Sequence, residues 1–215
     1  YTGGTVDTAW DMDRPEITII HGKDLRDKVS TRFGFRTIEI RPDKGFFLNG
    51  ERRQFRGVCL HHDLGPLGAA INKAAIRRQL TILKDMGCDA IRTSHNMPEP
   101  ELVQACNEMG MMVMAESFDE WKRAKVKNGY NRDFKEWIEK DIVNLVRRYR
   151  NDPSVVMWCM GNEVPDQGTG DGGKINRMIQ DIFHREDPTR PCTVCMDRVD
   201  LVVKNGFAHI LDIPG

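Results

Sequence analysis

The sequence predicts an α/β protein whose main part is an incomplete (β/α)8 TIM barrel, with about six of the eight strands. Short apolar runs of strand length alternate with longer segments whose apolar residues recur at helical spacing, which indicates a parallel sheet with helices packed outside it. The runs are almost wholly apolar, as strands covered on both faces are. A doubly wound sheet is disfavoured, because no glycine-rich phosphate turn follows an early strand.

The N-terminal part of the chain is expected to form strands rather than helices. Strand patterns occupy residues 17–20, 35–40, 46–48 and 54–56. Residues 35–40 alternate apolar and polar side chains, as a half-buried antiparallel strand does. Asn49-Gly50 separates the last two patterns, and Asn-Gly between strands is the strongest short-range signal of a β-hairpin.

The barrel strands are expected in the apolar runs that follow. These runs are residues 56–60, 89–92, 111–115, 155–160, 192–196 and 209–213. Helical patterns separate the first five runs and occupy residues 73–86, 99–109, 133–149 and 173–185. Gly87 and Gly110 end the first two helices, and Asp152-Pro153 closes the third helical region. Because the chain stops on a strand pattern before a full set of strands, we expect it to be part of a longer protein.

Composition argues against several classes of partner. Lys plus Arg and Asp plus Glu number 32 each, so the formal net charge is zero and nucleic acid is not an expected partner. The sequence contains no run of about 18 apolar residues, the length that a membrane-spanning helix needs, so no membrane partner is expected. The six cysteines show no disulfide pattern, which favours a reducing cytoplasm.

Polar side chains follow four of the predicted strands. These are His61 to Asp63, Arg92 to Asn96, Glu116 to Trp121 and Asn162-Glu163. Because the carboxyl ends of barrel strands meet at one rim, we expect these side chains to lie together and to form the functional site. Two of these residues also have a purely structural interpretation. Arg92 could be an ion-pair partner inside the barrel, and Trp121 could be a packing residue. Glu116 could be a loop charge in solvent.

The sequence predicts no metal site and no cofactor. His61, His62 and Asp63 are adjacent on one loop, and such neighbours seldom supply a whole ligand set, so binding of sugar hydroxyls is the preferred role. Cys192 and Cys195 form the one Cys-x-x-Cys, but strand alternation would send their side chains to opposite faces. Buried free thiols are the better interpretation of both.

Several segments resemble glycoside hydrolase family 2, the group of β-galactosidases, β-glucuronidases and β-mannosidases. They are Thr-Arg-Phe-Gly-Phe-Arg at 31–36, Phe-Leu-Asn-Gly at 47–50, Arg-Gly-Val at 56–58, Ile-Arg-Thr-Ser-His at 91–95, and Arg-Asn-Asp-Pro-Ser-Val-Val-Met-Trp at 150–158 before Gly-Asn-Glu at 161–163. They occur in the family's order and cover most of residues 31–165. Phe-Asp-Glu-Trp at 118–121 looks most like the β-galactosidase-like branch.

The resemblance implies a retaining β-glycosidase that hydrolyses terminal β-linked sugars by a two-carboxylate double displacement, with a carbohydrate as substrate. Glu163 matches the family's acid/base. Asn162 matches the neighbour that binds the sugar 2-hydroxyl, and His61, Arg92 and His95 match positions that hold the sugar or orient the carboxylates. From their place after the third strand, Glu116 and Trp121 are also expected to bind the substrate. The nucleophile is expected from a later strand beyond this chain, so residues 1–215 alone are expected to be inactive.

The resemblance also has consequences for domains and metals. It implies that residues 1–40 are the C-terminal part of an immunoglobulin-like β-sandwich, and that 41–215 are the N-terminal part of the catalytic barrel. Some relatives use magnesium with a His two residues after a Glu on the loop after strand three. Glu120 is instead followed by Lys122, which argues against such a site.

Several alternatives stay open. A non-catalytic carbohydrate-binding barrel would keep the same rim, and a cellulase-like hydrolase would share the Asn-Glu pair, although an upstream sandwich argues against it. β-Glucuronidase or β-mannosidase specificity is an alternative to β-galactosidase specificity. A homo-oligomer is compatible with the sequence. Similar enzymes are also exported, so the periplasm remains an alternative to the cytoplasm.

Overall fold

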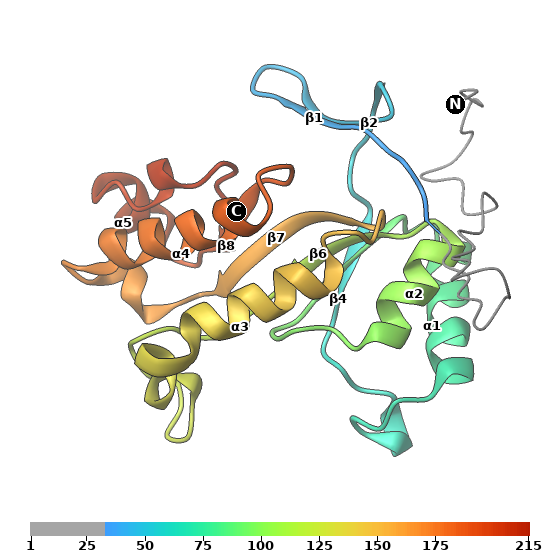
Figure 1. The fold of residues 1–215 in the computed structure, drawn as a ribbon, viewed down its shortest axis with the longest axis horizontal. Helices are drawn as coiled ribbons and strands as arrows, with labels where there is room; N and C mark the ends of the chain where they lie inside the picture. The colour runs from blue at the N-terminus through green and yellow to red at the C-terminus, as the bar shows by residue number, and fades with distance from the viewer. Residues whose placement is uncertain (1–32) are drawn as a thin grey trace, which may run out of the picture.

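The computed structural model describes residues 33–215, and its main body is a parallel sheet with helices packed along it (Figure 1). The sheet has five strands in the order β4-β5-β6-β7-β8, so every strand lies beside the one before it in the sequence. The strands are β4 Gly57–Leu60, β5 Ala90–Thr93, β6 Met112–Glu116, β7 Val155–Asn162 and β8 Cys192–Cys195. All four neighbouring pairs are parallel, as the sequence predicts.

The four predicted helices are confirmed, each with its ends within two residues of the expected ones. They are α1 Lys73–Asp85, α2 Pro100–Met109, α3 Phe134–Tyr149 and α4 Gly172–Glu186. The Asn72 side chain caps α1 by accepting a hydrogen bond from the Ala75 N–H. Gly110 ends α2 in the left-handed conformation with φ of 70°, which glycine adopts without steric strain. A short helix that the sequence does not predict, α5 Val199–Lys204, follows β8.

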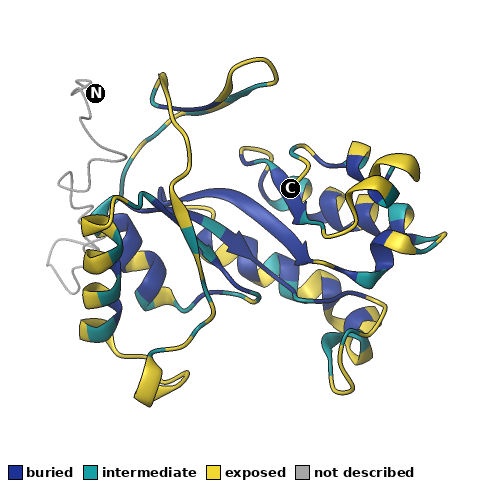
Figure 2. Cartoon of the chain, turned by 180° about the vertical axis from the view of Figure 1, so that it is seen from behind, coloured by how far each residue is buried: buried dark blue, intermediate teal, exposed yellow. Residues whose placement is uncertain are grey.

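The two faces of the sheet pack against different partners. On one face, apolar side chains such as Ile91, Val113 and Val194 form a core with the buried stripes of the helices. On the other face, Met112 and Val156 pack against a small antiparallel sheet. Figure 2 shows the buried residues gathered along the strands and the inward sides of the helices. None of the four residues of β4, an edge strand of the described sheet, is fully buried.

The small sheet comprises β1 Ile38–Arg41, β2 Gly45–Leu48 and β3 Glu51–Arg52. Leu48 pairs with Glu51 across Asn49 and Gly50, whose φ values of 52° and 80° fit the two-residue turn that Asn-Gly favours. The predicted hairpin is therefore confirmed, but its second arm is β3 rather than residues 54–56. Phe46 and Leu48 of β2 pack over the first residues of β5 and β6, so this sheet covers the N-terminal end of the parallel strands.

Arg36 connects the segment before β1 to the start of β7. Its Nε donates to the Pro153 carbonyl and its Nη2 to the Val155 carbonyl, both at 2.7 Å. Burial lowers the pKa of Arg36 to about 10. These bonds satisfy carbonyl groups at the beginning of the longest strand, and they give the second arginine of the Thr-Arg-Phe-Gly-Phe-Arg segment a structural role.

One predicted strand is wrong. Within residues 209–213 the structure has the end of a 3-10 turn, η4 Ala208–Ile210, followed by bends. Gln180 of α4 donates from Nε2 to the Ile210 carbonyl, and Leu211 is buried in the helix-side core. A short apolar run can be buried as a turn as well as a strand, and periodicity alone does not separate the two. The described sheet therefore has five parallel strands rather than six.

Other predictions about the chain's organisation are not resolved by the structure. The strand expected at 17–20 lies outside the described residues, as does most of the proposed sandwich segment. The predicted domain boundary after residue 40 falls inside β1, and the division into two domains stays a prediction. In the described part, no helix combines the length and apolar character needed to cross a membrane. All six cysteines are free.

Candidate active site

The carboxyl ends of β5, β6 and β7 bring three of the predicted site residues into one hydrogen-bonded cluster. Arg92 donates from Nε to Glu116 Oε2 at 2.5 Å and from Nη2 to Asn162 Oδ1 at 2.9 Å. Each residue lies on a different strand at the same rim, because the strands run in parallel. The Arg92 guanidinium therefore links the ends of three neighbouring strands.

Two histidines extend this cluster. His95 Nδ1 lies 2.9 Å from Glu116 Oε1 and 3.3 Å from Arg92 Nη2. The ring of His61, which follows β4, meets the His95 ring edge-on with the centroids 4.9 Å apart. The structure thus brings His61, Arg92, His95 and Asn162 together, as the strand-end pattern predicts.

Glu116 is enclosed by its partners. Its side chain has no exposed surface, and both carboxylate oxygens accept contacts from Arg92 and His95. Burial raises the pKa of Glu116, while the Arg92 guanidinium and the hydrogen bonds from Arg92 and His95 oppose the rise. In this structure Glu116 therefore holds Arg92 and His95 in place rather than reaching a sugar, which differs from the substrate contact expected of it.

Trp121 also differs from its expected role. The ring is completely buried, its Nε1 donates to the Met160 carbonyl at 2.8 Å, and its centroid lies 6.0 Å from that of Phe207. It offers no face to a ligand at the rim. The packing interpretation is the one that fits, since the buried ring contacts β7 near its carboxyl end.

Glu163 directly follows β7 with an unusual backbone conformation. Its φ is 46°, a left-handed value that costs a non-glycine residue about 1–3 kcal/mol and persists only where the surrounding structure imposes it. Hydrogen bonds on both sides do so: Asn162 N–H donates to the Phe118 carbonyl at 3.1 Å, and Glu163 N–H to the Cys195 carbonyl at 2.7 Å. The Glu163 side chain is 52% exposed, so its carboxylate is presented to solvent at the rim.

Two members of the site, Asp119 and Lys125, are not among the catalytic and substrate-binding residues named from the sequence. Asp119 Oδ1 accepts from Asn162 Nδ2 at 3.1 Å and from Lys125 Nζ at 2.7 Å. Burial alone would raise the pKa of Asp119, but the hydrogen bonds from Lys125 and Asn162 outweigh it and lower the pKa. Lys125 Nζ also donates to the Asn162 carbonyl at 3.0 Å and lies 4.0 Å from Glu163 Oε2.

The two residues differ in how they could have been found. Asp119 follows a strand end within the segment 118–121, so the rule that selects Glu116 would also select it. Lys125 carries no pattern, since it reaches the rim from a loop without regular structure. Together the contacts form one polar chain through Glu116, Arg92, Asn162, Asp119 and Lys125 to the Glu163 carboxylate.

Gly161 allows β7 to pass close to Trp121, which leads to a prediction. A Cβ at this position would lie 2.8 Å from Trp121 Nε1 and 2.8 Å from Val164 Cγ1, closer than real contacts allow. We expect Gly161→Ala to lower the free energy of unfolding by about 1–3 kcal/mol through overpacking. Urea denaturation measures the change. Gly170→Ala is the matched control, because a Cβ there meets nothing within 4 Å; equal stability of the two variants would contradict the prediction.

Comparison with known proteins places the chain in a family. Residues 38–211 match the sequence profile described as glycosyl hydrolases family 2, TIM barrel domain. The chain belongs to glycoside hydrolase family 2. This confirms the resemblance seen in the sequence. The parallel sheet and its helices agree with the TIM barrel domain of that family, whereas a preceding immunoglobulin-like domain is not shown.

The relatives include proteins named as β-galactosidases and proteins named as β-glucuronidases. The β-galactosidase BoGH2A of Bacteroides ovatus is 47% identical over 163 residues, which are 74% of this chain and 19% of that protein. A β-glucuronidase of Bacteroides fragilis is 29% identical over 174 residues, 80% of this chain and 25% of that protein. The chain thus spans about a fifth to a quarter of the length of these relatives.

Two solved structures resemble the fold of this chain closely. A glycosyl hydrolase family 2 member from Bacteroides cellulosilyticus has a TM-score of 0.85 and 34% identity, covering 92% of this chain and 25% of that one. A β-glycosidase from Bacteroides vulgatus has a TM-score of 0.76 and 40% identity, covering 83% and 23%.

Proposed function

We propose that the protein is a retaining β-glycosidase in which Glu163 is the acid/base. The observation that carries this is the position of Glu163: a half-exposed carboxylate follows a wholly buried strand and is fixed beside Asn162 at the rim. Family membership supports the reaction class, since the named relatives are β-galactosidases and β-glucuronidases.

The mechanism requires two carboxyl groups on either side of the glycosidic bond. Glu163 would first protonate the departing oxygen and then, as a carboxylate, take a proton from the water that releases the sugar. The nucleophile that forms the glycosyl-enzyme would come from a strand that follows β8. Retention requires the two carboxyl groups to be about 5–5.5 Å apart.

The neighbours of Glu163 would hold the sugar in a fixed position relative to the acid/base. Asn162 uses Oδ1 to accept from Arg92 and one Nδ2 hydrogen to donate to Asp119. Its second Nδ2 hydrogen has no partner among residues 33–215 and is the group we assign to the sugar 2-hydroxyl. His61 is exposed at the rim and His95 partly exposed, so both can meet other hydroxyls.

We further propose a β-galactoside as substrate, because BoGH2A shows the higher identity of the two relatives described above. The test uses the full-length protein with 4-nitrophenyl β-galactoside, β-glucuronide and β-mannoside. We expect the β-galactoside to have the highest kcat/KM, and NMR of the first-formed product to show the β-anomer.

The other outcomes identify the alternatives. Preference for the glucuronide or the mannoside would keep the reaction and overturn the sugar. An α-anomer as first product would overturn retention. Saturable sugar binding without turnover of any glycoside would instead identify a carbohydrate-binding barrel.

A further inference from the structure

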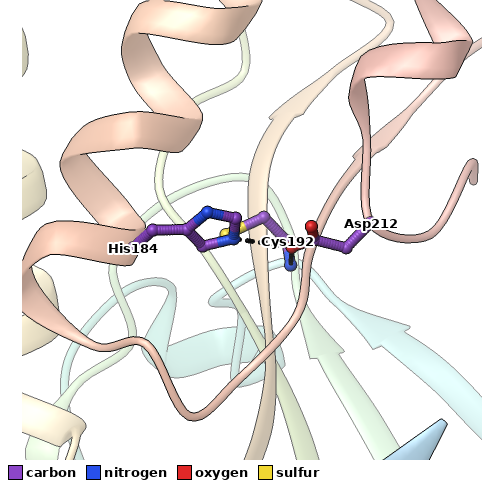
Figure 3. A group of neighbouring side chains, drawn as sticks. All are labelled: His184, Cys192 and Asp212. Atoms are coloured by element: carbon purple, nitrogen blue, oxygen red, sulfur yellow. Dashed lines mark hydrogen bonds and ion pairs between the residues drawn. The ribbon is translucent and has the colours of Figure 1, made fainter.

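A second group of polar side chains lies at the start of β8, away from the rim that carries Glu163. His184 is in the last turn of α4, Cys192 is the first residue of β8, and Asp212 follows η4. Their ligand atoms, an imidazole nitrogen, the thiol sulfur and a carboxylate oxygen, all lie within 4.8 Å of one another. Figure 3 shows the three side chains converging from three different segments.

The contacts within this group hold Asp212 in position. His184 Nε2 lies 2.7 Å from Asp212 Oδ2, and the Cys192 backbone N–H donates to the same oxygen at 2.7 Å. Cys192 is fully buried, whereas the side chains of His184 and Asp212 are 38% and 33% exposed. The group therefore has a buried sulfur at its base and two ligands that an ion can reach from solvent.

We propose that His184, Cys192 and Asp212 form a Zn²⁺ site. One thiolate, one carboxylate and one neutral imidazole balance the charge of a divalent cation, and all three ligand types are ones that zinc uses. Tetrahedral ligands at ordinary zinc bond lengths are roughly 3.3–3.6 Å apart. Small side-chain rotations would bring the three atoms to that spacing, with a water molecule as the fourth ligand.

Cys192 supplies the sulfur of the proposed site, and this sulfur lies within 4.8 Å of the imidazole nitrogen and the carboxylate oxygen of the other two ligands. Its Sγ has no hydrogen-bond partner among residues 33–215, unlike Cys159 and Cys195, whose sulfurs lie 3.8 Å apart on the other face of the sheet. The two thiols of Cys-x-x-Cys thus point to opposite faces, as the strand pattern predicts, and only Cys192 belongs to this group.

The proposed site would be structural rather than catalytic. Cys192 begins β8 beside Trp158, in the middle of β7, whereas Glu163 follows the carboxyl end of β7, so Cys192 does not belong to the rim. An ion bound there would join the end of α4, the start of β8 and the segment after η4. The inference is independent of the proposed reaction.

The experiment adds Co²⁺ to the full-length protein after chelator treatment. We expect one equivalent to give visible d–d bands of a tetrahedral ion together with a near-ultraviolet thiolate charge-transfer band, and Zn²⁺ to displace it and raise Tm. Cys192→Ser should remove the charge-transfer band and weaken zinc binding more than about 100-fold. Cys195→Ser is the matched control and should keep both.

Either of two results would overturn the site. One is the absence of a charge-transfer band in the unsubstituted protein, which would leave the group as a hydrogen-bonded cluster only. The other is a band that survives Cys192→Ser or disappears in Cys195→Ser. Because a change at buried Cys192 could affect folding, His184→Gln provides a second variant on a partly exposed residue, and it should weaken zinc binding without changing the far-ultraviolet CD spectrum.

Discussion

Replacing Glu163 with glutamine is expected to slow hydrolysis of glycosides with poor leaving groups by about 10²–10⁴-fold, the contribution of a positioned acid or base. Glutamine keeps the shape of the side chain at the end of β7 but cannot donate the proton. Aryl glycosides with very good leaving groups need little protonation, so their glycosylation step should be affected much less. The measurement is kcat/KM for both kinds of substrate with the full-length protein.

Azide supplies a second test of the same role. It can attack the glycosyl-enzyme without help from a base, so it should restore turnover of the good substrate by Glu163→Gln and yield a glycosyl azide. Glu136→Gln, at an exposed position on α3, is the control and should behave like the unsubstituted enzyme. Equal losses on both substrates, without an effect of azide, would remove Glu163 from the acid/base role.

Replacing Arg92 with methionine is expected to lower the free energy of unfolding by about 3–5 kcal/mol, more than the other substitutions that we propose. The reason is that the Glu116 carboxylate stays buried without its ion-pair partner. The side chain of Glu116 is fully buried and that of Arg92 only 16% exposed, so water cannot replace the lost contact. Arg77→Met removes an ion pair to Glu108 of the same length, 2.5 Å, but on the surface. That control should lose less than about 1 kcal/mol.

The loss in Arg92→Met should depend on pH. The pKa of Glu116 is already raised by burial in the native enzyme, and removing the opposing charge of Arg92 raises it further. A carboxyl group that holds its proton more tightly when folded makes the protein less stable as the pH rises from its unfolded pKa to its folded pKa. Urea titrations should therefore show a larger deficit at pH 8 than at pH 5. A deficit that does not vary with pH would contradict this explanation.

The helices and parallel strands were predictable because their signals are local and repeated. The stripe of Ile138, Ile142 and Leu145 has one helical period, and all three residues are buried in α3. The apolar run at 209–213 is too short to show such a period. Its conformation depends on contacts with α4, which cannot be read from the run itself. The Asn49-Gly50 dipeptide predicts where the hairpin turns. It does not predict where the strand after the turn lies, which is why β3 differs from the expected residues 54–56.

The site was predictable to the extent that strand ends determine it. Arg92 and Asn162 meet because they end parallel strands at one rim. Once a strand ends, the direction of the next side chains depends on tertiary packing, so Trp121 turns into the core although it follows β6 by only a few residues. Lys125 reaches Asp119 and Asn162 from a loop, and no local pattern marks such a long-range contact.

The sequential order of the parallel strands has a consequence for how this part of the chain folds. Each strand from β5 to β8 pairs with the strand immediately before it, with one connecting segment between them. Each pairing step therefore closes only the one segment between neighbouring strands, and the chain entropy lost is smaller than in a sheet whose paired strands are more distant in sequence. On the ribosome, β4 to β6 can pair before β8 has been synthesised. The order in which the chain is made is also an order in which the sheet can be assembled.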